Sequence, residues 1–131
     1  MTRAGPELTI HKAIVQQLQS RMPDDALWFH IPNGEYRGAR TGSKLKGMGV
    51  KAGAADLCVV YHGRVVFLEI KAPKGRQQDT QKAWAAQAVR AGACYVIATS
   101  SAEALAKLAL CGVPIKPVFD AMTAANYRGA A

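Results

Sequence analysis

Three ionisable residues near the middle of the chain have a spacing that could support metal-binding and proton-transfer chemistry. Asp56 comes directly before one apolar run, residues 57–61. Glu69 lies near the end of the next run, residues 64–70, and Lys71 comes directly after it. The dipeptide between the runs suits a two-residue hairpin turn. The strand pairing that such a turn sets places Asp56 directly opposite Glu69, with β-carbons about 4.5–5.5 Å apart. Alternation along a strand then places Lys71 on the same face as Glu69.

Two opposed carboxylates destabilise a sheet unless a positive charge compensates them. One of the two carboxyl groups also holds its proton more tightly. Mg²⁺ removes this conflict, because it prefers oxygen ligands and is commonly held by one or two carboxylates with water and phosphate oxygens. Lys71 could orient or deprotonate a water, or stabilise charge on a phosphate. The alternative is a surface salt-bridge cluster, but both acids end apolar strands in a chain with only nine acids.

The flanking sequence predicts the elements that position these residues. Helical spacing and helix-ending Pro or Gly residues predict helices over residues 7–22, 78–91 and 101–110. Runs of β-branched and aromatic residues predict strands over residues 26–31, 57–61, 64–70 and 94–99. The order α-β-β-β-α-β-α indicates an α/β fold with a mixed central sheet that contains a hairpin and has helices packed on its faces. The tail over 113–131 has no clear period, and we expect it to be irregular.

Residues 34–55 are rich in glycine and basic residues and contain almost no large apolar side chain, so we expect a long loop. A loop of this length in a compact domain is usually functional or disordered. Lysine and arginine neutralise phosphates largely without regard to sequence, which favours a nucleic-acid contact over a solvated flexible loop. The candidate contacts, from this loop and from the segment after Lys71, are Arg37, Arg40, Lys44, Lys46, Lys51, Lys74 and Arg76.

The composition of the chain narrows the class of protein. Its 131 residues fit one domain, and 17 basic against 9 acidic residues give a net charge of +8, which favours an anionic partner. No apolar run approaches the roughly 20 residues of a membrane helix, and the first residues have no apolar signal-peptide core. The three cysteines are widely spaced, which argues against a disulfide framework or a zinc site and fits a reducing cytoplasm. We therefore expect a cytoplasmic protein without a membrane partner.

Several short motifs together carry a family resemblance. They are Glu7, the turn Pro32-Asn33-Gly34, and the segments Gly53-Ala54-Ala55-Asp56, Glu69-Ile70-Lys71, Lys74-Gly75-Arg76 and Gln81-Lys82-Ala83-Trp84. The chain resembles the VRR-NUC branch of the PD-(D/E)xK nuclease superfamily over about residues 5–110. The resemblance implies a single VRR-NUC-type domain with a restriction-endonuclease-like αβββαβ core. Ala55 stands where the signature has proline, which is not a ligand in that family.

The resemblance also implies roles for individual residues in a metal-dependent DNA endonuclease. Asp56 and Glu69 would bind Mg²⁺ or Mn²⁺, with the Ile70 carbonyl as a further ligand and Glu7 completing the set directly or through water. Lys71 would position the attacking water. Gln81 would orient that water, Lys71 or a phosphate oxygen. From the residues alone, Glu7 also fits a favourable charge at a helix N-terminus, and Gln81 an ordinary helix surface residue.

Standalone members of this family resemble homodimeric junction resolvases of phage and bacteria. The resemblance therefore implies a homodimer that acts on branched DNA, such as four-way junctions or flaps, in a bacterial or phage-infected cell. We see no base-reading helix motif, so we expect recognition of shape and backbone. Two alternatives stay open: a non-catalytic nucleic-acid-binding module, and a PD-(D/E)xK nuclease with another DNA target. We expect His30 to be packed or solvated rather than in contact with DNA, and Trp28 and Trp84 to belong to the core rather than to stack on bases.

Overall fold

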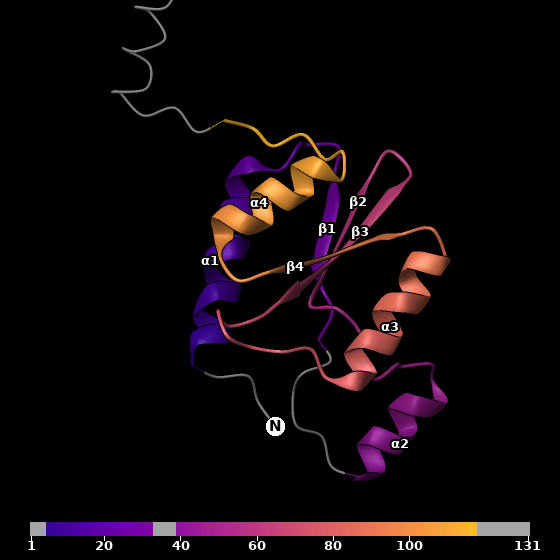
Figure 1. Cartoon of the computed structure of the whole chain (residues 1–131). Helices are drawn as coiled ribbons and strands as arrows, with labels where there is room; N and C mark the ends of the chain where they lie inside the picture. Colours follow the sequence, from indigo (N-terminus) through magenta and orange to yellow (C-terminus); the bar gives the residue numbers. More distant parts are fainter. Residues whose placement is uncertain (1–4, 33–38, 118–131) are drawn as a thin grey trace, which may run out of the picture.

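A four-stranded mixed sheet lies at the centre of the computed structural model, which describes residues 5–32 and 39–117 (Figure 1). The elements are α1 (Pro6–Arg21), β1 (Leu27–His30), α2 (Ala39–Gly47), β2 (Leu57–Tyr61), β3 (Arg64–Ile70), α3 (Asp79–Arg90), β4 (Cys94–Ala98) and α4 (Ser101–Leu110). The strand order is β1-β2-β3-β4, with β4 parallel to β3 and the other neighbours antiparallel. The predicted mixed sheet with an internal hairpin is therefore confirmed.

The β2–β3 hairpin has the register that its two-residue turn predicts. Tyr61 pairs with Arg64, and Leu57 pairs with Leu68 at the other end. His62 and Gly63 have φ values of 46° and 81°, the left-handed conformation that this type of turn requires. Beyond Leu57 and Leu68 the regular ladder ends, because the Asp56 amide donates to the Leu68 carbonyl, but the carboxyl groups of Asp56 and Glu69 still lie close together.

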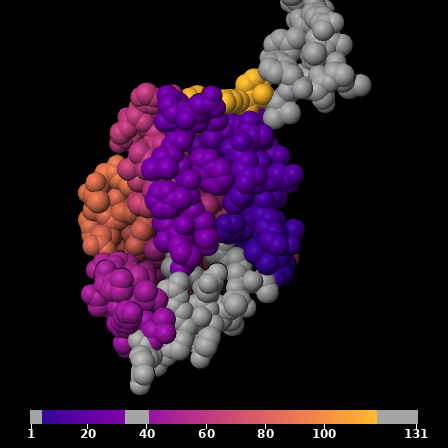
Figure 2. Space-filling model, turned by 180° about the vertical axis from the view of Figure 1, so that it is seen from behind, coloured from indigo at the N-terminus to yellow at the C-terminus, as the bar shows by residue number. Residues whose placement is uncertain are grey.

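Helices cover both faces of the sheet. Figure 1 shows α1 and α4 on one side and α3 on the other. The first side encloses the main core, in which Leu18, Leu68 and Leu108 are fully buried. On the other side, the rings of Phe67 and Trp84 meet edge to face with centroids 4.7 Å apart. Figure 2, the view from behind, shows β1 at the surface, where it forms one edge of the sheet.

The chain contributes to the core beyond its last helix. Residues 113–117 have no regular secondary structure, as predicted for the start of the tail. Val113 is nevertheless fully buried in the main core, and the Lys116 amide donates to the Arg21 carbonyl over 2.8 Å. This segment therefore ties α4 to the end of α1. The predicted tail beyond residue 117 lies outside the described residues.

The prediction of a continuous loop over residues 34–55 is wrong, because residues 39–47 form the helix α2. The segment holds helix-favouring Lys44, Leu45 and Lys46, but its glycines and single large apolar residue conceal any helical period. A Cβ added at Gly42 or Gly47 would meet no other atom within 4 Å, so neither glycine is needed for close packing.

Two further observations concern the class of protein. None of the helices in the described residues is long and apolar enough to cross a membrane. The three cysteines are free thiols, and Cys58 is buried while Cys94 and Cys111 are partly buried.

Candidate active site

The two predicted carboxylates lie together, almost fully buried, at one end of the hairpin. Asp56 is 3% exposed and Glu69 is 1% exposed. The Asp56 Oδ2 atom accepts a hydrogen bond from the Ile70 amide over 2.8 Å, and the Asp56 amide donates to the Leu68 carbonyl. The aspartate is therefore fixed against the opposite strand by its side chain and its backbone.

Lys71 and Gln81 complete a hydrogen-bonded cluster with the carboxylates. The Lys71 Nζ atom lies 3.4 Å from Glu69 Oε2 and donates to Gln81 Oε1 over 2.8 Å. The Gln81 Nε2 atom donates to Glu69 Oε2 over 2.8 Å. Gln81 Oε1 also accepts from the Gln78 amide in the capping box of α3. These contacts orient the Gln81 amide and bring the first turn of α3 onto the end of β3.

Burial gives Glu69 an unusual electrostatic environment. Its burial, together with the nearby negative charge of Asp56, raises the pKa of Glu69 to about 8, while Lys71 opposes the shift. Its Oε1 atom is buried and accepts no hydrogen bond from any residue in the described ranges. A buried polar atom without a partner is costly, and native structures usually have a reason to keep one. A divalent cation would satisfy this oxygen and would favour the ionised form of both acids.

The donor set therefore fits a hard divalent cation such as Mg²⁺ or Mn²⁺. Within residues 5–32 and 39–117, no three His, Cys, Asp or Glu side chains gather as a ready metal site. Asp56 and Glu69 would thus supply part of a ligand set that backbone carbonyls, water and phosphate oxygens complete. The Ile70 amide donates to Asp56, and Glu7 lies half-buried in the first turn of α1.

Comparisons with known proteins identify the fold. No protein-family model and no curated protein match this sequence. A solved structure described as "VRR_NUC domain protein" matches with a TM-score of 0.62 and 20% identity, covering 85% of this chain and 91% of that chain. A second, described as "VRR_NUC domain", matches with a TM-score of 0.54 and 19% identity, covering 82% of this chain and 97% of that chain. The chain has the VRR_NUC fold. This confirms the predicted restriction-endonuclease-like core.

Two histidines support this end of the VRR_NUC fold in a way that sequence analysis missed. His30 Nδ1 lies 2.8 Å from the Asp56 carbonyl oxygen. Since a carbonyl only accepts, this nitrogen carries the hydrogen. The His30 ring meets the ring of His11 edge to face at 4.7 Å, and His11 is 9% exposed. The spacing of His11, Ile14 and Leu18 on the buried face of α1 is the signal that could have indicated a packed histidine.

Five of the predicted basic contacts are described by the structure and lie near the same end of the VRR_NUC fold. Lys44 and Lys46 are exposed on α2, and Lys51 is exposed in the segment that leads to β2. Lys74 and Arg76 are exposed between β3 and α3. Figure 1 shows both segments beside the N-terminal end of α3, where Gln81 lies. Arg37 and the Asn33-Gly34 turn lie outside the described residues, and Arg40 is described only as a backbone position of α2.

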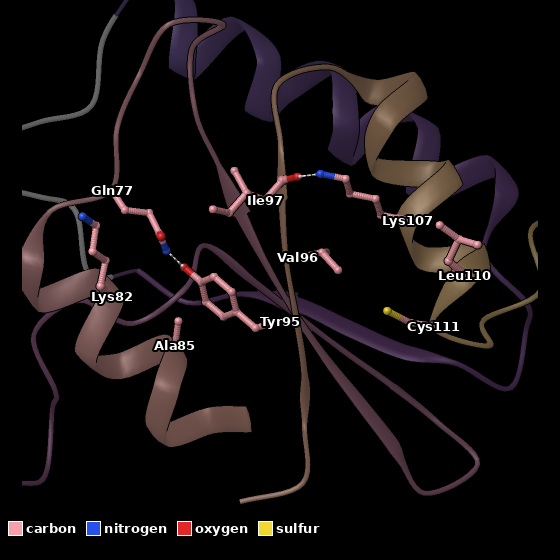
Figure 3. Close-up of a pocket in the computed structure, with 9 residues that line it drawn as sticks. All are labelled: Gln77, Lys82, Ala85, Tyr95, Val96, Ile97, Lys107, Leu110 and Cys111. Atoms are coloured by element: carbon pink, nitrogen blue, oxygen red, sulfur yellow. Dashed lines mark hydrogen bonds between the residues drawn. The ribbon is translucent and has the colours of Figure 1, made fainter. Parts of the chain in front are cut away.

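A cleft of about 510 Å³ also lies along the outer edge of β4, between α3 and α4 (Figure 3). None of the four clustered side chains of the candidate active site lines it. The Lys107 Nζ atom donates to the outward-facing Ile97 carbonyl over 2.6 Å, and Gln77 donates to the Tyr95 hydroxyl over 3.0 Å. A lysine over an open strand edge discourages pairing with another strand, so we assign this cleft to protection of the edge.

Proposed function

We propose that this protein is a metal-dependent endonuclease that hydrolyses phosphodiester bonds in DNA. The observation that carries the proposal is the buried cluster of Asp56, Glu69, Lys71 and Gln81 at the end of the sheet. The names of the two similar structures and the basic residues around the site support a nuclease. A purely structural ion pair would not need two opposed carboxylates with an unsatisfied oxygen.

Asp56 and Glu69 would hold Mg²⁺ or Mn²⁺, with the Ile70 carbonyl and Glu7, directly or through water, as further ligands. When bound, the cation stabilises the negative charge that develops on phosphate oxygens in the transition state. The unsatisfied Oε1 atom of Glu69 and its opposition to Asp56 are the features of this chain that such an ion would complete.

The remaining side chains would handle the attacking water. Lys71 would keep its ammonium beside the water, because its Nζ atom is held by Gln81 Oε1 at 2.8 Å. The water oxygen would attack phosphorus and lose a proton to solvent, while the bond from phosphorus to the leaving oxygen breaks and that oxygen takes a proton from solvent and leaves as a hydroxyl group. Gln81 would hold the side chains of both Lys71 and Glu69 in place through its two hydrogen bonds, so we assign it a positioning role.

A cleavage assay with variants tests this proposal. Supercoiled plasmid and branched DNA should be cut with Mg²⁺ or Mn²⁺, and EDTA should stop the reaction. Asp56→Asn and Glu69→Gln should lower cutting at least about a thousandfold while DNA binding stays within about twofold of the wild type. Variants that bind poorly but cut at the normal rate would contradict the assignment. A wild-type protein that binds DNA and never cuts it would favour a non-catalytic binding module.

We further propose a homodimer that selects branched duplexes such as four-way junctions or flaps. Two symmetric sites could nick opposite strands of one branched substrate. The edge strand β1 supports self-association, because Leu27 and Phe29 lie on one face of it and are 61% and 45% exposed. A substrate panel of four-way junction, flap, single strand and linear duplex tests the selectivity. Sequence-specific cutting of unbranched duplex would point to a restriction-type enzyme instead.

A further inference from the structure

A second cleft, of about 460 Å³, opens beside the candidate active site. Its walls come from three parts of the chain: the residues after β1, the segment from α2 to β2, and α3. None of the described lining residues is acidic, and one is a lysine. The side chains that matter below are Ile31, Leu45, Val50, Lys51, Ala54 and Trp84.

The cleft adjoins the carboxylate pair. Ala54 lies two residues before Asp56, and Trp84 lies three residues after Gln81, about one turn further along the same face of α3. The segment before β2 rests directly on α3, since a Cβ at Gly53 would lie 2.3 Å from the Thr80 carbonyl oxygen. A ligand in this cleft would therefore be next to groups that act on a phosphate.

The chemistry of the walls suits one nucleotide. The Trp84 ring is held edge-on by Phe67, at 4.7 Å and 79°, yet it remains partly exposed. Aromatic rings fixed in this way stack on unpaired bases of any identity. Ile31, Leu45 and Val50 offer apolar surface to a base but nothing to a phosphate. The exposed ammonium of Lys51 offers the charge that the attached phosphate needs.

We propose that this cleft accepts one unpaired nucleobase of the DNA substrate, beside the phosphate that is cut. The proposal rests on the proposed nuclease function. It explains how such a nuclease could select DNA that contains unpaired bases. A base that is paired and stacked in a duplex must be extruded at a cost before it can enter, whereas a base at a mismatch, branch point or end is already available. Cutting should therefore favour phosphates next to unpaired bases.

Two matched variants test the cleft. Val50 lines it and Val89, on α3, does not line it; both are exposed, at 41% and 56%. Val50→Glu and Val89→Glu thus make the same change in charge at two exposed valines. The probe is a duplex with one 2-aminopurine opposite an abasic site, and the control duplex pairs the same base with thymine. Binding is followed in EDTA by 2-aminopurine fluorescence and by anisotropy.

Wild-type protein and Val89→Glu should quench the unpaired 2-aminopurine on binding, because the base stacks in the cleft. Val50→Glu should lose this quenching and bind the unpaired-base duplex about tenfold more weakly, with less than about a twofold change for the paired duplex. If Val50→Glu does not fold, Val50→Asn carries the same expected loss of quenching. Equal quenching by the Val50 and Val89 variants, or none by the wild type, would overturn the proposal.

Parallel cleavage assays in Mg²⁺ separate this proposal from the proposed function. Equal cutting rates on the two duplexes would leave the nuclease in place and remove the base-accepting cleft. Quenching by the wild type without any cutting would remove the nuclease and leave a base-binding site. Preferential cutting of the unpaired-base duplex that Val50→Glu loses and Val89→Glu keeps would support both.

Discussion

Glu69 combines three properties that rarely occur together in a side chain without a function. It is 1% exposed, it faces another buried carboxylate, and one of its oxygens accepts no hydrogen bond from the described residues. Lys71 and Gln81 satisfy only its other oxygen. Its raised pKa makes the stability of the folded protein depend on proton and cation binding at this residue.

In EDTA, the stability of the wild type should fall as the pH rises from about 4.5 to about 8. The pKa of Glu69 is higher in the folded protein than in the unfolded chain, so the folded state binds more protons in this window and loses stability as they leave. Below the window both states are protonated, and above it both are ionised. Thermal denaturation across this range measures the effect, with Glu69→Gln expected to flatten it.

Glu103→Gln is the matched control for that experiment, because Glu103 is a glutamate of α4 with a backbone amide partner. It should keep the wild-type slope. At pH 8, Mg²⁺ should raise the melting temperature of the wild type and of this control but not that of Glu69→Gln. Wild type and Glu69→Gln with equal pH slopes would show that Glu69 is not the titrating group.

Gln81→Ala should lower kcat by roughly 10–100-fold with little change in KM. The substitution removes the amide that joins Lys71 to Glu69, while the DNA contacts remain. Gln87→Ala is the control, since Gln87 is an exposed glutamine on the same helix, and it should leave both constants unchanged. Steady-state cleavage kinetics on a defined flap substrate provide the comparison. Equal effects of the two substitutions would mean that Gln81 acts only as a surface residue.

Among the elements, the contact between the segment before β2 and the first turn of α3 sets the site. Gly53 has a φ of 83°, and a Cβ there would come within 2.3 Å of the Thr80 carbonyl oxygen. This close approach aligns Gln81, at the start of α3, with the carboxylates of the hairpin. The glycine is therefore required both for its backbone conformation and for its lack of a side chain.

Gly53→Ala should destabilise the protein by about 1–3 kcal/mol more than Gly63→Ala. Both glycines have a positive φ, so alanine is strained by about 1 kcal/mol or more at either position. Only Gly53 also faces backbone atoms, because a Cβ at Gly63 would meet nothing within 4 Å. Urea denaturation of the two variants measures the difference. A smaller loss for Gly53→Ala would show that the segment can move away from α3 without cost.

For the whole molecule, the net charge of +8 and its placement would govern the DNA binding that we propose. The exposed lysines of α2 and the exposed Lys74 and Arg76 between β3 and α3 gather at the end of the sheet that carries the carboxylates. A cationic surface beside an acidic pair can hold the DNA backbone and still admit a divalent cation. Backbone contacts of this kind release counterions, so affinity should fall steeply with salt.

Lys46→Ala should reduce the slope of log K against log salt concentration by about 1, because it removes one phosphate contact. Lys116→Ala is the control, since Lys116 pairs with Asp24 at 2.7 Å and follows α4 rather than flanking the site. It should leave the slope unchanged. Fluorescence anisotropy with a labelled duplex at several salt concentrations gives both slopes. A similar reduction from Lys116→Ala would indicate that binding is spread over the whole surface.

The sequence alone determined the register of the hairpin, which brings Asp56 and Glu69 close together at its open end. Strand alternation has a period of two and His62-Gly63 permits one tight turn, so a local pattern fixes the pairing. Only the tertiary structure decided how far these acids are buried and that Gln81 bridges Glu69 and Lys71. Those features depend on α3 returning over the sheet, a contact between segments that no local spacing encodes.

The dependence on contacts between distant segments also explains which features the sequence predicted wrongly or did not reveal. The helix α2 has one large apolar residue and no period to detect, and the bond from His30 to the Asp56 carbonyl joins strands far apart in sequence. The apolar cleft lined by Trp84 exists because three separated segments converge next to the carboxylates. Residue types and turns define which groups are available for chemistry; packing decides which of them meet, and which are removed from water.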